Sequence, residues 1–373
     1  MDSSWFSLST TFRHHQITPQ GSIAFRIVTG LESIAFLAVP IFFVLSGFLI
    51  GGILYSTRDR EGYFKVFYCR RVIRVFPLYY LALLIIGCVD ASLKFSIDYR
   101  FWTHFLFIQN LFPRYATYNS PAVLRHYWTL ATEEQFYLLW PLVVWLFPRR
   151  RQLFVIASLL IVFIFGLRFA SPYLFSFSYQ IGYFSLTRAD AILMGVLLAL
   201  IRNEAGFEWM KRLAKWIALA GGAGLVVWAL RNGEYWPKTF QGVQIIIPWL
   251  NFTAASIVIA VMEEKSWLNE VCSQRWICWL GKRSYSLYIF HYTYYHFFAM
   301  NVVAQLAHYM SQRRSVVVAS ALAFSLTLVL AMLSYRFIEI PAQRLKQHLK
   351  YGPVKENSSS PKLREEILVG TGA

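Results

Sequence analysis

The apolar run that decides the fold reads Pro40-Ile41-Phe42-Phe43-Val44-Leu45-Ser46-Gly47-Phe48-Leu49-Ile50-Gly51-Gly52. It lies inside a longer apolar stretch, residues 34–55, which has roughly the 20 residues that a helix needs to cross a bilayer. Gly47 and Gly51 form a G-x-x-x-G pair, a spacing that lets two helices approach closely. Two interpretations of these small residues stay open: close helix packing, or a narrow acyl channel lined by glycines.

Similar apolar runs recur along the whole chain. Further membrane helices are expected at 73–91, 134–148, 152–170, 185–201, 214–230, 243–262, 283–302 and 315–338. The region 101–112 is apolar but short, which favours a re-entrant or interfacial segment. Charged residues make up only 15% of the chain and hydrophobic residues 57%, whereas ordinary soluble domains carry about 25% charged residues. The sequence therefore predicts an all-α, polytopic transmembrane helical bundle.

Basic residues predict how this bundle is oriented. The loop 56–72 is strongly basic and is expected in the cytoplasm, and alternation of the spans places most other basic regions on the same side. These regions hold Arg149-Arg150-Arg151, Arg202, Lys211, Arg212, Lys215, Lys265, Arg275, Arg344, Lys346 and Lys350, whereas Arg313-Arg314 runs against the rule. We expect one transmembrane domain over 1–340 and a disordered, basic cytoplasmic tail over 341–373. These loops and the tail then account for the net charge of +17, so it does not indicate nucleic-acid binding.

Two features are absent from the sequence, a signal peptide and a metal-binding cysteine pattern. Residues 1–20 have no apolar core, so no cleavable signal peptide is expected. The four cysteines show no C-x-x-C pair and no zinc-binding spacing, so we expect free thiols and no metal; they are Cys69, Cys88, Cys272 and Cys278.

A cluster of arginines precedes the second apolar run. Arg70, Arg71 and Arg74 form Arg-Arg-x-x-Arg directly before Val75-Phe76-Pro77-Leu78-Tyr79. Guanidinium groups pair well with phosphate because they are planar and donate in a fork. The arginines are therefore candidates for binding a polyanion at the predicted start of a helix, although the ordinary cytoplasmic excess of basic residues also explains them.

The most specific polar block is His126-Tyr127-Trp128-Thr129-Leu130-Ala131-Thr132-Glu133-Glu134-Gln135-Phe136-Tyr137. Glu133 and Glu134 can serve as first-turn carboxylates that the helix dipole favours. Alternatively, ionisable groups at a membrane boundary mark a functional site, and a partly buried glutamate suits proton transfer. His126 and Trp128 are substrate candidates beside them.

Other polar residues stand at the ends of apolar runs. His14 and His15 offer a general base or a plain surface pair. Arg188 and Asp190 enter an apolar helix but are two residues apart, so a direct pair is not assured. Tyr288 and His291 are three apart and can share a helix face. Glu339, at a helix end, is expected to neutralise one of the loop arginines.

These blocks together resemble the acyltransferase 3 family of membrane-bound acyltransferases, over about residues 14–345. The blocks that carry the resemblance, in family order, are Phe42–Leu49, Arg70–Tyr79, Trp128–Tyr137, Arg188–Ala191, Ser284–Tyr288 with His291, and Glu339–Pro341. The family has about ten membrane helices. Its first helix carries an arginine and, eleven positions later, a catalytic histidine. His14 or His15 matches that histidine, but Ser3 and Ser4 occupy the place of the arginine, so the first helix is expected to be incomplete here.

The resemblance implies an enzyme that moves an acyl group, most often acetyl, from acyl-CoA to a hydroxyl of a carbohydrate or related acceptor. Arg70, Arg71 and Arg74 would hold the CoA phosphates, with no permanently bound cofactor. His14 or His15 would act as general base, and Glu133 or Glu134 would orient it. The thioester oxyanion needs a donor, for which Arg188, Tyr288 and His291 are candidates. A multi-pass protein of a bacterial inner membrane, with a cytoplasmic C-terminus, is expected.

Three further hypotheses remain. A covalent acyl-enzyme is less favoured, because no G-x-S-x-G elbow is present and Ser46 lies in an apolar block. A transporter or flippase of a lipid-linked or anionic substrate, without chemistry, would also place polar groups inside a helical bundle. A non-catalytic membrane sensor that keeps the fold is a third reading. The acceptor, the acyl chain length and the oligomeric state do not follow from the sequence.

Overall fold

The bundle is built from helices because backbone groups in a bilayer must pair within their own segment. The computed structural model describes residues 37–93, 99–111, 122–174, 184–204, 206–232, 240–263, 266–294, 300–306 and 308–354. Within those ranges there is no β-strand, only an isolated bridge between Arg60 and Val354. The prediction of an all-α bundle is confirmed. His14, His15 and the expected incomplete first helix lie outside the described residues.

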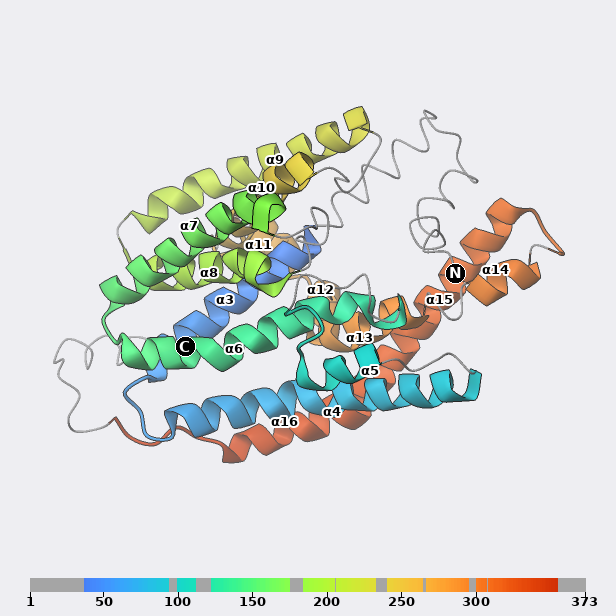
Figure 1. Cartoon of the computed structure of the whole chain (residues 1–373), viewed down its shortest axis with the longest axis horizontal. Coiled ribbons are helices and arrows are strands. Elements are labelled where there is room, and N and C mark those ends of the chain that lie inside the picture. The colour runs from blue at the N-terminus through green and yellow to red at the C-terminus, as the bar shows by residue number, and fades with distance from the viewer. Residues whose placement is uncertain are drawn as a thin grey trace.

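A helix occurs in every one of the predicted spans (Figure 1). The long helices are α3 (Ala38–Thr57), α4 (Tyr63–Leu93), α6 (Trp128–Leu146), α7 (Arg150–Leu174), α8 (Ser185–Ile201), α9 (Phe207–Asn232), α10 (Phe240–Val261), α13 (Ser284–Tyr294) and α15 (Gln312–Ser334). By length and composition, six helical segments of the described chain are able to cross a membrane, in α3, α4, α7, α9, α10 and from α15 to the residues after it.

Shorter elements join these helices. They are α5 (Tyr99–Trp102), η2 (Thr103–Leu106), η3 (Ala122–Tyr127), α11 (Trp267–Cys272), α12 (Arg275–Lys282), α14 (Met300–Leu306), a π-helical turn η6 (Tyr335–Glu339), α16 (Ile340–Leu345) and η7 (Lys346–His348). The short apolar region predicted at 101–112 is therefore only α5 and η2, in agreement with a segment too short to span. The described beginning of the expected tail, residues 341–354, contains most of α16 and all of η7, and its last residues hydrogen-bond to Glu61 and Arg70.

The second helix begins earlier than the sequence suggested. α4 starts at Tyr63 rather than near residue 73, directly after Gly62, whose φ of +75° turns the chain out of the preceding loop. Lys and Arg are good helix formers, so the basic stretch continues the apolar helix instead of preceding it. The arginine cluster therefore lies inside a helix. Arg71 and Arg74, three residues apart, share one face of it.

The glycines of α3 decide how closely it packs on α8. A Cβ added at Gly47 would lie 1.8 Å from the backbone oxygen of Ile192, and one at Gly195 would lie 2.0 Å from the oxygen of Val44. Neither contact is possible for a residue with a side chain, so the two backbones touch through glycine. The structure thus supports close packing for Gly47, and Gly51, which approaches Val196, lies in the same contact.

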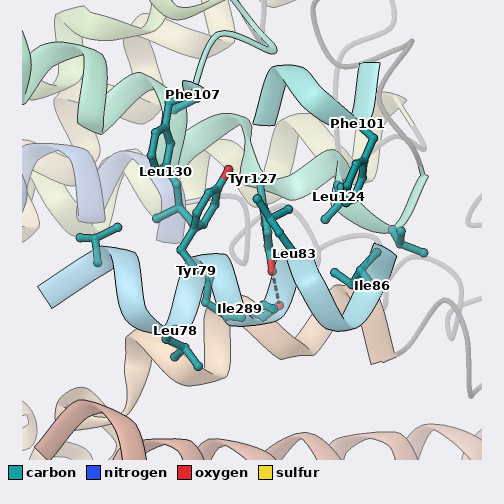
Figure 2. Packing of buried hydrophobic residues seen from close by; sticks show 14 residues of the cluster. Leu78, Tyr79, Leu83, Ile86, Phe101, Phe107, Leu124, Tyr127, Leu130 and Ile289 are labelled. Atoms are coloured by element: carbon teal, nitrogen blue, oxygen red, sulfur yellow. Dashed lines mark hydrogen bonds between the residues drawn. The ribbon is translucent and has the colours of Figure 1, made fainter. Parts of the chain in front are cut away.

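A cluster of buried side chains holds α4 against η3, the start of α6 and α13. In Figure 2, Tyr79 and Leu83 of α4 face Tyr127 and Leu130, and the hydroxyl of Tyr127 donates to the backbone oxygen of Ile289 in α13. This cluster places α4, the start of α6 and α13 at fixed positions relative to one another.

Three of the predicted cytoplasmic loops lie together at one end of the bundle. In Figure 1 the ends of α3, α6 and α8 and the starts of α4, α7 and α9 all lie toward the left. Contacts agree: Tyr63 donates to the backbone oxygen of Pro141, and Arg150 pairs with Glu204 at 2.6 Å. We call this the basic end.

Candidate active site

A cavity of about 370 Å³ lies between α3, α4, α6 and the α12–α13 region. Its wall is mostly apolar, with hydroxyl groups and three charged side chains. The lining residues are Val39, Phe42, Phe43, Leu45, Ser46, Leu49, Ile50, Ile53, Arg71, Arg74, Val75, Thr129, Leu130, Glu133, Tyr137, Gly281, Ser284, Tyr285 and Tyr288. A narrow apolar space with few polar groups is the usual form of a ligand site.

One face of α3 forms the longest part of this wall. Its lining residues run from Val39 to Ile53, about 21 Å of helix at the usual rise. They recur at helical spacing, and Gly47 and Gly51 fall on the face toward α8 instead. α3 is apolar all round, so its sequence does not reveal which face meets α8 and which meets the cavity. The glycines therefore do not line this cavity, whose wall along α3 comes from Ser46 and apolar side chains.

Arg71 and Arg74 supply positive charge to the cavity, and Arg71 lies against Tyr137. The guanidinium carbon of Arg71 lies 3.6 Å from the centre of the Tyr137 ring, and its side chain also hydrogen-bonds the Tyr137 hydroxyl. Arg74 is exposed. Arg71 interacts electrostatically with Glu133 and Glu134. An exposed arginine beside a partly buried one leaves donors available for an anionic ligand.

A polar group sits midway along the cavity. The hydroxyls of Ser46 and Tyr137 hydrogen-bond each other, and both reach the carboxylate of Glu133. Tyr137 is 2% exposed, whereas Ser46 is partly open to the cavity. Of the two adjacent carboxylates, Glu133 lines the described cavity wall and Glu134 does not. The structure therefore distinguishes two glutamates that the sequence treated alike.

The far end of the cavity carries the predicted Tyr288, with His126 and His291 behind it. The Tyr288 hydroxyl donates to the backbone oxygen of His126 and lies against Thr129. Ring centres of His126 and His291 are 5.0 Å apart, and His126 is 5.3 Å from Tyr288. Burial lowers the pKa of the His126 imidazole well below its ordinary value of 6.5, and nearby His291 lowers it further. These three predicted residues do come together.

Arg70 points away from the other two arginines. Its guanidinium donates two hydrogen bonds, of 2.9 and 2.6 Å, to the backbone oxygen of Leu349, and it lies 5.3 Å from the centre of the Tyr351 ring. Backbone bonds between Glu61 and residues 352–353 hold the same segment. We call residues 346–354 the strap. Arg70 is not among the residues that line the described cavity.

Arg188 and Asp190 belong to a different, buried network. Asp190 pairs with Arg168 of α7 at 2.5 Å and accepts a bond of 2.8 Å from Asn251 of α10. Arg188 is 2% exposed and lies 5.5 Å from the centre of the Trp128 ring. Neither lines the cavity in the described structure. Removing one partner of a buried ion pair typically costs 3–5 kcal/mol, so replacing Arg168 or Asp190 alone would weaken the contact between α7, α8 and α10.

The sequence missed three residues of these two sites. The sequence does not predict a catalytic role for Ser46, because its neighbours are apolar. Tyr137 has no feature that separates it from the other residues of its block, and Arg168 is a single arginine near the end of an apolar run. Arg168 is 0% exposed. The one signal that pointed to it is general: a charge well inside a membrane helix needs a partner. The partner itself comes from another helix, and no local pattern names it.

Comparisons with known proteins agree with the resemblance. The model of a family described as an acyltransferase domain matches residues 7–336. YrhL of Bacillus subtilis (strain 168), provisionally named a peptidoglycan O-acetyltransferase, is 28% identical over 371 residues, which is 88% of this chain and 55% of that protein. The peptidoglycan O-acetyltransferase OatA of Listeria monocytogenes is 25% identical over 350 residues, covering 86% of this chain and 53% of OatA.

A provisionally named O-acetyltransferase of Staphylococcus aureus (strain COL) is 28% identical over 341 residues, which is 83% of this chain and 53% of that protein. The chain thus spans about half the length of the curated relatives it matches. No solved structure matches it significantly.

Proposed function

Because this chain belongs to the acyltransferase 3 family, whose model covers residues 7–336, we propose that it is a membrane-embedded O-acetyltransferase. It moves an acetyl group from acetyl-CoA to a hydroxyl of a carbohydrate. The relatives' names mention peptidoglycan, so a cell-wall glycan is the proposed acceptor. The transmembrane domain extends over 1–340, followed by a basic tail over 341–373.

One observation carries this proposal: the cavity joins an apolar wall along α3 to a group of arginine, hydroxyl and carboxylate side chains. CoA has phosphates at one end and a slender arm that ends in a thioester. Arg74, which is exposed, binds the phosphates, because guanidinium groups match phosphate geometry. Arg71, three residues away on the same helix face, adds positive charge between the phosphates and Tyr137. The arm lies along the apolar face of α3, and the thioester reaches the group formed by Ser46, Glu133 and Tyr137.

The acceptor enters from the opposite end. There Tyr288, with His126 and His291 behind it, forms the wall. Tyr288 orients the acceptor there, since its hydroxyl proton is donated to the backbone oxygen of His126, and His14 or His15 remains the proposed base on that side. Arg188 and Asp190 keep a supporting role through the Arg168 network. The basic end faces the cytoplasm of a bacterial cell, by the excess of basic residues there.

The test is acetyl transfer by the purified full chain. The protein, in detergent or nanodiscs, receives labelled acetyl-CoA and a glycan acceptor; release of CoA with label on a hydroxyl is expected. Arg71→Gln with Arg74→Gln should raise the apparent KM for acetyl-CoA at least tenfold. Arg151→Gln, an exposed arginine in the first turn of α7, is the matched control and should change nothing.

Two results would contradict the proposal. Binding or flux of substrate without loss of the thioester would favour a transporter. CoA binding that is the same in the double variant and in the Arg151→Gln control would remove the donor site, even if transfer itself occurs.

A further inference from the structure

The geometry points to Ser46 as an acyl-carrying nucleophile that splits the transfer into two half-reactions. This inference rests on the proposed function and deepens it. Three observations support it: the place of Ser46 along the cavity, the groups that touch its hydroxyl, and the lining around it.

Ser46 lies at the midpoint of the cavity wall. The lining residues of α3 extend from Val39 to Ile53, so Ser46 is seven residues, about 10 Å of helix, from either end. A donor held at the basic end and an acceptor from the other end approach this point from opposite directions. A carrier at the midpoint removes the need for both substrates to occupy a narrow cavity of about 370 Å³ together.

The neighbours of Ser46 match the needs of a nucleophile. A serine hydroxyl is a weak nucleophile unless an adjacent base accepts its proton, and the Glu133 carboxylate is within hydrogen-bonding reach. The developing oxyanion needs positive donors. The Tyr137 hydroxyl hydrogen-bonds Ser46, and Arg71 lies over the Tyr137 ring at 3.6 Å and hydrogen-bonds that same hydroxyl.

Other hydroxyls of the cavity wall are less suited to this role. Tyr285 donates a 2.7 Å bond to the backbone oxygen of Val75, and Tyr288 donates to that of His126. Tyr137 reaches Glu133 as well, but it is 2% exposed. Ser46 combines access to the cavity with a carboxylate.

In the first half-reaction Ser46 Oγ attacks the carbonyl carbon of acetyl-CoA. The bond from that carbon to Oγ forms and the bond to the CoA sulfur breaks. The hydroxyl proton passes to Glu133 and then to the leaving sulfur, which departs as CoA thiol. In the second, an acceptor hydroxyl attacks the acetyl-serine carbonyl carbon, the bond to Ser46 Oγ breaks, and the acceptor's proton restores the serine hydroxyl. Apolar side chains around Ser46 keep water from the ester.

The experiment is a burst assay on the full chain without acceptor. Labelled acetyl-CoA should release up to one CoA thiol per chain, leave label on the peptide that contains Ser46, and lose that label on addition of acceptor. Ser46→Ala should abolish burst and label and lower transfer by roughly 10³-fold or more. It should still bind CoA, which shows that it folds. Ser46→Cys should carry the label as a thioester.

Ser56→Ala is the matched control, since Ser56 is on the same helix, donates to the backbone oxygen of Ile53 and is not among the residues that line the described cavity; it should keep burst and transfer. Wild-type transfer without any label on the chain, label on Tyr137 instead of Ser46, or full transfer by Ser46→Ala would each overturn the inference and leave the proposed function intact. Wild-type protein that neither binds CoA nor transfers acetyl would overturn both.

Discussion

At the scale of single residues, Glu133 and Glu134 differ in what they touch. Glu133 lines the cavity and reaches two hydroxyls, whereas Glu134 is outside the described wall. Glu133→Gln removes a proton acceptor and should lower kcat by roughly 10²–10⁴-fold, with CoA affinity little changed. Glu134→Gln, the matched control, should lower kcat much less. Equal losses in steady-state transfer assays would show that the cavity geometry does not distinguish them.

His126 makes stability depend on pH. In the unfolded chain its pKa is the ordinary 6.5, and burial lowers it in the folded protein. Protons then bind the unfolded chain first, so stability is complete above pH 6.5 and falls as the pH drops below it. His291 of α13 and His104 of η2 are the titratable neighbours, and both oppose a charge at His126.

The measurement is thermal unfolding in detergent between about pH 7.5 and 5. His126→Gln should flatten the loss of stability on acidification, and the exposed His308→Gln should leave it as in the wild type. A wild-type midpoint that does not change over this range would contradict a neutral, buried His126.

At the scale of elements, the contact between α3 and α8 depends on glycine at Gly47. Gly47→Ala would place a methyl group 1.8 Å from the Ile192 backbone oxygen, and a backbone atom cannot yield without moving the helix. We expect a loss of at least the roughly 1–3 kcal/mol typical of overpacking. Gly52→Ala, where the nearest atom is 3.9 Å away, is the control. Equal thermal midpoints for the two variants would argue against this close contact.

A variant of Arg70 can show whether this arginine of the Arg-Arg-x-x-Arg motif binds the strap or the CoA phosphates. Since its guanidinium holds Leu349, Arg70→Gln should free the strap and speed tryptic cleavage after Lys346 and Lys350. The KM for acetyl-CoA should rise less than in Arg71→Gln. If Arg70→Gln instead weakens CoA binding as much as Arg71→Gln and leaves the strap protected, the sequence-based assignment of Arg70 to the phosphates is right.

At the scale of the whole molecule, the basic turns that join α3 to α4, α6 to α7 and α8 to α9 lie at one end of the bundle (Figure 1). In a protein freed of its native cysteines, single cysteines at Arg60, Arg151, Arg202 and Lys350 should react with an impermeant thiol reagent from the same side of the membrane. A cysteine at Tyr173, which is 91% exposed near the far end of α7, should react from the other side. Mixed labelling within the first set would refute the shared orientation.

The sequence by itself determined the class of fold, because the bilayer leaves an apolar run of about 20 residues few options other than a helix. It also marked Arg71, Arg74, Glu133 and Tyr288 for the site, through charged or hydrogen-bonding groups in otherwise apolar surroundings. The sequence did not predict the start of α4 correctly, because basic residues form helix as readily as apolar ones.

Only the tertiary structure decided which side chains share a space. α3 is apolar on every face, so the choice of Gly47 for packing and Ser46 for the cavity depends on where α8, α4 and α6 lie. Arg70, next to Arg71 in sequence, meets the strap because successive helix residues point about 100° apart. The partners of Ser46 and Arg168 are far along the chain, and contacts between distant helices leave no mark in a local pattern of residues.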